Sequence, residues 1–263
     1  MENIDTKKIT SLLDKKYPLN EIVYTQETDS TNNLAKREHN KPDKTLFIAD
    51  IQTAGRGRNE RIWVSDNNSG LWMSLLLKPD IEPQKLSCIT LVAGVSVVRA
   101  MKNILGKDVH IKWPNDIVLG NKKLSGILCE GSFLNNKLNY AVLGIGINLN
   151  QEVFDKDLEN IACSVKNSFG KEISREDVCA EILNCFWPLY HDYLENGMKN
   201  IILEYKKNCI TLNKEILVIN GNKKEKAYAH DLDNDGHLII KTDNGIKTVS
   251  SGEVSVRGIF GYM

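Results

Sequence analysis

The spacing of apolar residues predicts helices in the first part of the chain. Two short helices are expected over residues 5–16 and 31–38, where apolar side chains recur on one helical face. A longer helix that faces the core is expected between Pro83 and Gly106, since proline favours the start of a helix and glycine its end.

A fourth helix is expected to run from Ser174 towards Asn196. Ser174, with Asp177 three residues later, resembles a capping box, which satisfies backbone N–H groups at the start of a helix. Pro188 lies inside this segment and lacks a backbone N–H, so we expect it to kink or split the helix. Together the helices are expected to form a layer on a sheet.

Strands are expected where apolar and polar residues alternate or where β-forming residues cluster. The expected strands of the first sheet cover residues 45–51, 71–78, 109–113, 116–119, 123–133 and 138–148. The turn-forming pairs Gly120-Asn121 and Asn135-Asn136 separate the last three, which predicts an antiparallel meander. The centre of the protein is therefore expected to be a sheet.

The pattern changes to short β runs beyond about residue 213. Asn-Gly and Asp-Gly pairs, which favour tight turns, punctuate these runs. The runs cover residues 215–220, 225–231, 237–241 and 246–250. We therefore expect a larger α+β domain over 1–212 and a small β-barrel domain over 213–263.

Composition narrows the classes of partner. Lys and Arg total 34, and so do Asp and Glu, which argues against a whole-molecule field that would attract nucleic acid or an anionic membrane. The longest apolar stretch, around residues 89–101, falls short of the ~20 residues that cross a bilayer. The N-terminus lacks an export signal, and the six cysteines show no zinc-finger spacing. These features favour a cytoplasmic protein with reduced thiols and no structural metal.

The most informative segment is the arginine loop, which we define as residues 53–63. Its Gly-Arg-Gly-Arg sequence places Arg56 and Arg58 between glycines, and Arg61 and Trp63 follow. Glycines let backbone N–H groups approach phosphate oxygens, and planar guanidinium groups match phosphate geometry. Taken alone, the loop is as consistent with a solvated basic loop as with an anion site, since arginine-rich loops also bind nucleic acid non-specifically.

Four further motifs accompany the loop in a fixed order. They are Asp29-Ser30-Thr31-Asn32, Lys112-Trp113-Pro114-Asn115-Asp116, Lys123-Leu124-Ser125-Gly126-Ile127-Leu128 and Gly144-Ile145-Gly146-Ile147-Asn148. This ordered set resembles the biotin protein ligase family, and the resemblance resumes near the end at Ser251-Gly252-Glu253-Val254. Without the family, the first motif would be read as a helix cap and the second as a turn.

The resemblance implies a fold and a reaction. The fold would be a central mixed, mostly antiparallel sheet with helices, as in class II aminoacyl-tRNA synthetases and biotin ligases, followed by an SH3-like barrel. The enzyme would use ATP with Mg²⁺ to convert biotin into biotinyl-5′-AMP. It would then transfer biotin to a lysine of a biotin carboxyl carrier protein.

Some relatives in the family carry an N-terminal DNA-binding domain. Only about 27 residues precede the first motif here, fewer than the ~50 of a typical small domain, so we expect the monofunctional form with no specific DNA binding. No membrane partner is expected, and a homodimer is compatible with exposed sheet edges.

The resemblance also assigns residues. The residues expected to bind biotin are Ser30, Thr31, Asn32, Gln52, Arg56, Gly57, Arg58, Lys123 and Gly126. Those expected to bind ATP or the adenylate are Arg56, Arg58, Trp63, Lys112, Asn115 and Asn148. Those expected to act in catalysis are Lys123, Arg56, Arg58 and Asp116, and no residue is expected to hold a metal.

Charge neutralisation is the expected basis of the first reaction step. Biotin's carboxyl group, with a pKa near ~4, is already ionised at neutral pH and needs no general base. Lys123 is the expected main catalytic residue, since it would lie between two anions that repel each other. The acceptor lysine, with a pKa near ~10.4, must lose a proton, and Asp116 is the candidate base.

Three alternatives remain open. A lipoate or octanoate ligase of the same broad fold would also activate a carboxylic acid, although the arginine loop and the 112–116 motif favour biotin. A non-catalytic biotin-binding module would not need Arg56, Arg58 and Lys123. A nucleic-acid binder is disfavoured by the zero net charge. Asn59-Glu60 departs from the family, whose loop often continues with another basic residue and glycine.

Overall fold

A seven-stranded mixed sheet forms the centre of the protein in the computed structural model, which describes residues 3–65, 67–252 and 254–258. Its strands, in the order β1-β2-β3-β7-β6-β5-β4, are β1 (Glu21–Thr28), β2 (Thr45–Gln52), β3 (Leu71–Leu77), β4 (His110–Lys112), β5 (Asp116–Leu119), β6 (Lys122–Leu134) and β7 (Lys137–Ile147). β1 and β2 are parallel, and all the other neighbours are antiparallel. The expected mixed, mostly antiparallel sheet and its meander are confirmed.

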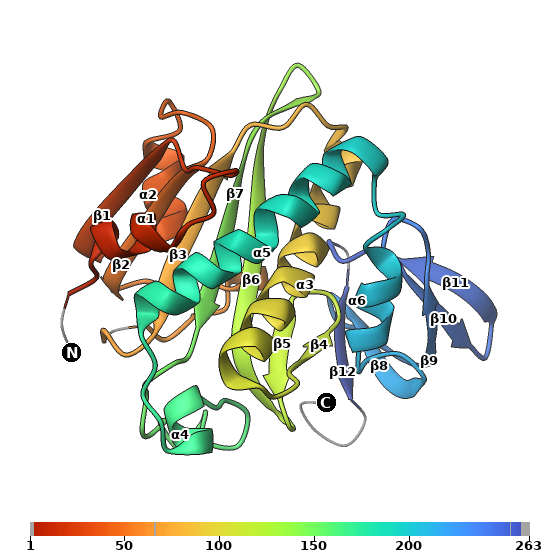
Figure 1. The fold of residues 1–263 in the computed structure, drawn as a ribbon. Helices are drawn as coiled ribbons and strands as arrows, with labels where there is room; N and C mark the ends of the chain where they lie inside the picture. The colour runs from red at the N-terminus through yellow and green to blue at the C-terminus, as the bar shows by residue number, and fades with distance from the viewer. Residues whose placement is uncertain (1–2, 66, 253, 259–263) are drawn as a thin grey trace.

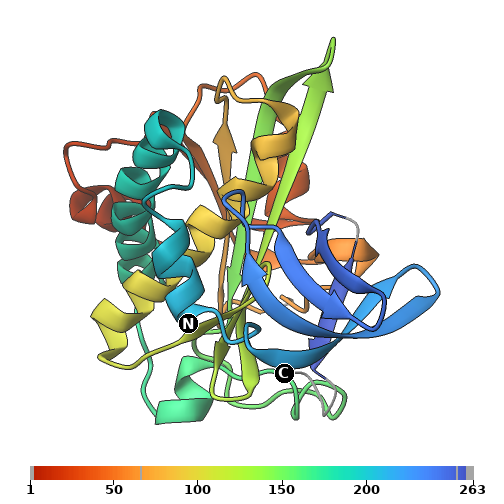
Figure 2. The same ribbon diagram turned by 90° about the vertical axis from the view of Figure 1, so that its right-hand side faces the viewer.

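Helices cover the two faces of this sheet unequally. Figures 1 and 2 show the long helices α3 (Leu86–Leu105) and α5 (Arg175–Asn196) lying across one face, with α1 (Thr6–Leu12) and α6 (Ile202–Asn208) beside them. The short α2 (Thr31–Arg37) packs on the opposite face. The remaining helical segments are α4 (Val165–Phe169) and the 3-10 turns η1 (Arg58–Glu60) and η2 (Pro83–Lys85).

Successive side chains of β3 point to opposite faces of the sheet, so they pack against different helices. Leu71, Met73 and Leu75 join the large core beneath α3 and α5. Leu76 instead joins a small cluster with Ala35 of α2 on the other face. Ser74 shares that second face, because side chains two residues apart on a strand point the same way. The polar residues described below lie on this second face.

The expected split of the fourth helix is wrong, because α5 runs unbroken through Pro188. The residues on either side of the proline, Trp187 and Leu189, are buried against the core. Packing of an apolar face supplies most helical stability in proteins, which compensates here for the lost backbone hydrogen bond. The capping hydrogen bond at the helix start is confirmed, since Ser174 Oγ accepts from the backbone N–H of Asp177.

A second sheet follows the first along the chain. Its strands, in the order β11-β10-β9-β8-β12, are β8 (Lys214–Asn220), β9 (Lys223–Leu232), β10 (Leu238–Thr242), β11 (Gly245–Val249) and β12 (Ser255–Gly258). The four expected β runs are confirmed. β12, which pairs antiparallel with β8, was not expected, and neither was β1 in the first sheet.

The second sheet is docked closely on the first unit. Trp113, in the turn after β4, donates from Nε1 to the carbonyl of Gly236 over 2.9 Å. Gly236 adopts φ +78°, and a Cβ there would lie 2.0 Å from Leu91 Cδ1 of α3. This close approach in a left-handed conformation requires glycine. The 112–116 motif therefore also carries a structural contact between the two sheets.

The segment Pro83–Leu105 is the one helix among the described residues that is long and apolar enough to span a membrane. Its most apolar window is 67% buried inside the protein, against α5 and the sheet. It has the properties of a core helix.

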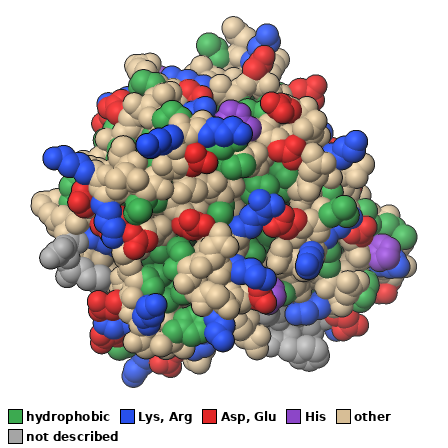
Figure 3. Space-filling view, viewed as in Figure 1, with side chains coloured by type: hydrophobic (Ala, Val, Ile, Leu, Met, Phe, Trp, Pro, Cys, Tyr) green, Lys and Arg blue, Asp and Glu red, His purple; other side chains and the backbone are tan. Residues whose placement is uncertain are grey.

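Charged side chains are mixed on the surface. On the face shown in Figure 3, acidic and basic side chains alternate over short distances rather than forming one field. This distribution agrees with the equal totals of acidic and basic residues.

Candidate functional site

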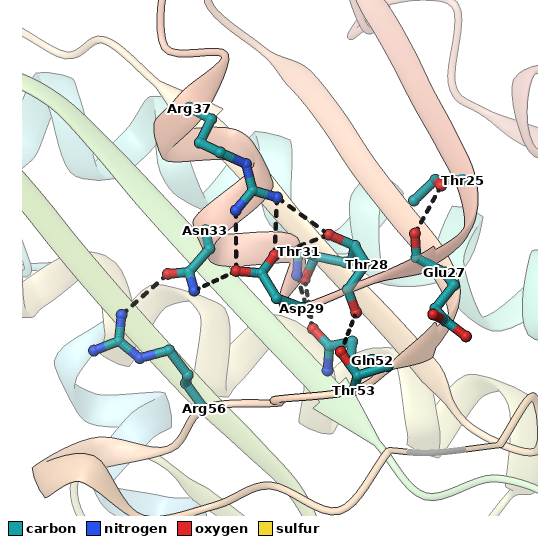
Figure 4. Close-up of polar contacts among 10 residues, drawn as sticks. All are labelled: Thr25, Glu27, Thr28, Asp29, Thr31, Asn33, Arg37, Gln52, Thr53 and Arg56. Atoms are coloured by element: carbon teal, nitrogen blue, oxygen red, sulfur yellow. Dashed lines mark hydrogen bonds and ion pairs between the residues drawn. The ribbon is translucent and has the colours of Figure 1, made fainter.

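A cluster of buried polar side chains lies where α2 begins, on the face of the sheet away from α3. We call Ser30, Thr31, Asn32, Gln52 and Ser74 the polar cluster, and each is at most 7% exposed. Gln52 Oε1 accepts from the backbone N–H of Thr31 over 2.8 Å, and Gln52 Nε2 donates to Ser65 over 3.0 Å. Figure 4 shows Gln52 beneath Thr31. The structure thus brings together the four residues predicted here and adds Ser74.

Ser30 does not behave as an ordinary helix cap. It occupies the N-cap position of α2, but its side chain makes no capping hydrogen bond to the helix. Helix N-terminal serines normally accept such a bond. The alternative interpretation of this motif, a plain helix cap, is therefore wrong for the Ser30 side chain.

Asp29 ties the start of α2 to its end and to the arginine loop. Arg37 donates to both carboxylate oxygens of Asp29, over 2.9 and 2.8 Å, and Asn33 donates to one of them (Figure 4). These hydrogen bonds, Arg37's first, hold the pKa of Asp29 well below its usual range. Asn33 Oδ1 in turn accepts from Arg56 over 3.1 Å. Arg56 is thereby held beside α2.

The arginine loop folds back on itself. Gly57 N–H donates to the carbonyl of Arg61 over 2.7 Å, and Trp63 N–H donates to that of Gly55 over 2.9 Å. A Cβ on Gly55 would lie 2.3 Å from the Trp63 carbonyl, so the turn requires glycine. The loop places Trp63 inward, and Arg61 stays exposed.

Arg58 points inward and is anchored by two regions of the chain. It donates to Asn115 Oδ1 over 3.0 Å and to the backbone carbonyls of Ser251 and Val254. Burial lowers the pKa of Arg58, because it removes solvent from the charged group. The neighbouring Glu253 of the Ser251–Val254 motif lies outside the described residues. The connection between β11 and β12 thus contributes backbone oxygens that hold a loop guanidinium.

Lys123 and Asp116 form an ion pair. Lys123 Nζ lies 2.6 Å from Asp116 Oδ1, and the two side chains are 25% and 18% exposed. Lys123 Nζ also lies 5.1 Å from the centre of a Trp63 ring, within the range of a cation–π contact. The two residues predicted for separate catalytic steps are therefore direct partners.

Trp63 lies over two strand glycines. A Cβ on Gly126 would lie 2.9 Å from the Trp63 ring, and one on Gly146 would lie 2.8 Å from Trp63 Nε1. Gly126 and Gly146 are opposite each other in the β6–β7 register. Missing side chains in a strand often mark a close approach, and the group that approaches these two glycines is the Trp63 indole.

Lys112 is a buried cation. It is 7% exposed, and burial lowers its pKa to about 8, with Asp116 opposing and Lys123 adding to this shift. We call Arg58, Lys112 and Lys123 the cation cluster. Water cannot solvate these charges fully, so the cluster is suited to an anionic group such as a phosphate.

The two asparagines predicted for the nucleotide have their amides engaged within the protein. Asn115 Nδ2 donates to the carbonyl of Ile127 over 2.9 Å, and its Oδ1 accepts from Arg58. Asn148 Nδ2 donates to the carbonyl of Cys163 over 3.1 Å. The backbone N–H of Asn148 donates to the carbonyl of Leu124, the residue after Lys123. Both asparagines lie beside the cation cluster and fix backbone around it.

Sequence reasoning missed two residues that contact the predicted ones. Ser74 touches Thr31 and Asn32, and its signal was a lone hydroxyl in an otherwise apolar strand. Glu130 of β6 accepts from Asn32, and nothing in the local sequence marked it. Among the described residues, no group of three or more His, Cys, Asp or Glu is placed to hold a metal ion.

The fold and this site define a ligase family that activates carboxylic acids. The chain belongs to the biotin/lipoate A/B protein ligase family, whose model matches residues 24–148. A second model, described as the biotin protein ligase C terminal domain, matches residues 211–257.

Particular relatives lie within this family. The chain is 37% identical over 241 residues to the bifunctional ligase/repressor BirA of Bacillus subtilis, covering 89% of this chain and 74% of that protein. It is 27% identical over 224 residues to the biotin--[acetyl-CoA-carboxylase] ligase of Mycobacterium tuberculosis, covering 81% and 79%. The biotin protein ligase of Aquifex aeolicus, solved in complex with biotin and ATP, superposes with a TM-score of 0.80 at 31% identity, covering 91% of this chain and all (100%) of that one.

Lys112 should titrate near pH 8. We expect the side-chain NMR signals of Lys112, assigned through a Lys112→Met variant, to report a pKa well below the ordinary 10.5, because burial disfavours the charged form. Between pH 8 and 10.5 the unfolded chain binds more protons at this position, so folding stability should rise with pH more in the wild type than in the variant. An NMR pKa near 10.5 would contradict the burial of this cation.

Proposed function

We propose that this protein is a biotin protein ligase that forms biotinyl-5′-AMP from biotin and MgATP and then biotinylates a lysine of a biotin carboxyl carrier protein. The observation that carries the proposal is the adjacency of the polar cluster and the cation cluster. Gln52 of the first donates to Ser65, two residues from Trp63, and Trp63 lies against Lys123 of the second. A ligand with a polar ring at one end and an activated carboxylate at the other fits this order.

The polar cluster would bind the ureido ring. A buried urea needs both donors and acceptors, which hydroxyl and amide groups supply. In this proposal Ser30, Thr31 and Gln52 contact the ring, and Asn32 supports them from behind. Arg56, Gly57 and Gly126 would line the path of the biotin tail towards Lys123.

Adenylation would proceed by charge neutralisation. A carboxylate oxygen of biotin attacks the α-phosphorus of ATP, and the bond to the β-phosphate breaks, releasing pyrophosphate. Arg56, Arg58, Lys112 and Lys123 offset the negative charge that gathers there. Trp63, Asn115 and Asn148 would shape the adenylate side. Mg²⁺ enters with ATP as part of the substrate.

Transfer would need a proton acceptor. The acceptor lysine loses a proton, its amine attacks the carbonyl carbon of the mixed anhydride, and AMP leaves with the bonding electron pair. We propose Asp116 as the base. Its ion pair with Lys123 places this carboxylate beside the proposed reaction centre.

Other features of the proposal concern organisation and location. We propose a catalytic domain over 1–212 and an SH3-like domain over 213–263, supported by the start of the second sheet at Lys214. The six free cysteines favour the reducing cytoplasm. The equal totals of acidic and basic residues speak against specific DNA binding, and β1, an outer strand of the first sheet, offers an edge for a homodimer.

Biotin should support exchange of labelled pyrophosphate into ATP, while lipoate and octanoate should not. In Lys123→Ala, exchange should fall about a hundredfold or more, because one preorganised charge at the reacting phosphate is lost. Lys122→Ala is the matched control, since this neighbouring lysine donates to the carbonyl of Glu159 at the surface. Exchange with lipoate instead would reassign the substrate, and no exchange with any acid would favour a binding module.

Asp116→Asn should separate the two half-reactions. We expect biotinyl-adenylate to form at a rate close to that of the wild type, and transfer to the acceptor lysine to slow by about a hundredfold, because an amide cannot take up the proton. Single-turnover measurements of each step test this. Equal losses in both steps would show that Asp116 acts only by orienting Lys123.

A further inference from the structure

The turn between β4 and β5 carries residues of the proposed reaction centre. Lys112 ends β4, Asp116 begins β5, and the two lie opposite each other in the sheet register. Trp113, Pro114 and Asn115 form the turn, and all three are buried. Buried backbone N–H and C=O groups need hydrogen-bond partners, because water does not reach them. The partners of this turn therefore determine where its side chains lie.

One side of the turn is held by its own sheet. The backbone N–H of Ile127 in β6 donates to the carbonyl of Asn115 over 2.9 Å, and Asn115 Nδ2 donates to the Ile127 carbonyl over 2.9 Å. The ring of Trp113 is held separately, because its Nε1 donates to Gly236. These contacts do not involve the backbone N–H of Trp113 or the carbonyl of Pro114.

Two side chains outside the sheet supply the partners of those backbone groups. Tyr205 of α6 donates from its hydroxyl to the Pro114 carbonyl over 3.0 Å. Thr211, in the connection between α6 and β8, accepts at Oγ1 from the Trp113 N–H over 2.9 Å. Tyr205 is fully buried, Thr211 is 5% exposed, and α6 packs beside β4 (Figure 1). The turn is thus held between β6 on one side and the α6 region on another.

The Tyr205 hydroxyl keeps its proton at neutral pH. Burial is the main cause that raises the pKa of Tyr205 well above its ordinary value, and the neighbouring Asp116 adds to this shift. A neutral tyrosine hydroxyl donates one hydrogen bond, which here goes to the Pro114 carbonyl. Proline has no backbone N–H, so this carbonyl is the one polar group of Pro114. The hydrogen bond from Tyr205 therefore acts directly on the backbone of the turn.

We propose that Tyr205 and Thr211 are positioning residues for adenylation, which hold the backbone of the 112–116 turn and thereby the side chains that it presents to the phosphate. Asn115 Oδ1 accepts from Arg58 over 3.0 Å, so a shift of the turn would move this guanidinium. The inference rests on the proposed function, which places the cation cluster beside the reacting phosphate. Tyr205 lies between the two segments that the family models match.

Tyr205→Phe removes the hydroxyl and keeps the ring. We expect the rate constant of biotin-dependent pyrophosphate exchange at saturating substrates to fall about tenfold, because the Pro114 carbonyl loses its partner and the turn shifts. The Kd for biotin of the nucleotide-free protein, measured by isothermal titration, should not change, since the polar cluster lies at the other end of the proposed site.

Tyr193→Phe is the matched control. Tyr193 is 4% exposed, and its hydroxyl donates to the backbone carbonyl of Lys85 over 2.7 Å in the helical layer. This variant should lose a similar amount of thermal stability to Tyr205→Phe and keep the wild-type exchange rate. An equal loss of exchange in both variants, or a raised Kd for biotin in Tyr205→Phe, would overturn the inference, because either result indicates a merely structural role.

Thr211 supplies a second pair of variants. Thr211→Val removes the acceptor of the Trp113 N–H and should slow exchange, whereas Thr211→Ser keeps a hydroxyl and should stay close to the wild-type rate. A wild-type rate in Tyr205→Phe would overturn the inference, and if that variant does not fold, equal rates in the two Thr211 variants would do so. A wild type that exchanges no pyrophosphate would instead overturn the proposed function, and this inference with it.

Discussion

Burying positive charge costs free energy unless an anion lies beside it, and this constraint organises the site. Lys112 is 7% exposed, and its pKa falls to about 8 because burial disfavours its charge. The pKa of Arg58 is lowered for the same reason, and Lys123 Nζ lies 2.6 Å from Asp116 Oδ1. A group with several negative oxygens would relieve all three cations at once. The surrounding strands and loops hold the three side chains of the cation cluster close together, where such a group could bind.

Each layer of the fold contributes to this arrangement. Strand pairing sets Asp116 opposite Gly126, and Gly126 opposite Gly146, which leaves space for Trp63 against Lys123. The connection between β11 and β12 supplies carbonyl oxygens to Arg58. α2 brings Thr31 and Asn32 to the other end of the site. In the proposed function, neighbouring elements would thus recognise a polar ring and neutralise a phosphate.

Much of the fold could be predicted from the sequence, because alternation is local. The pattern of Leu71, Met73 and Leu75 identified both β3 and the side chains that it contributes to the large core. β1 was not predicted because its residues are almost all half-buried and show no clear alternation of apolar and polar side chains. The split at Pro188 was wrongly predicted because the packing that compensates for its lost backbone hydrogen bond comes from segments far away in the sequence.

The candidate site residues could be predicted from sequence motifs, but the contacts that they make with one another could not. The Lys123–Asp116 pair depends on the β5–β6 register, which shifts between Ile117 and Val118, and no local pattern marks such a shift. Glu130 gains its contacts only when α2 is laid against β6, so its neighbours in the sequence gave no sign of them. Individual residues follow from short-range pattern, but charge pairing follows from tertiary structure.

The most direct test of the buried cation cluster is the number of protons taken up when an anion binds beside it. Biotinol-5′-AMP, a stable ester that keeps the phosphate charge, should be titrated calorimetrically at pH 8 in two buffers of different ionisation enthalpy. The account predicts uptake of roughly half a proton, since Lys112 is then about half charged and the phosphate raises its pKa. Lys112→Met should abolish the uptake. Binding of the ligand with no proton uptake by the wild type would contradict the account.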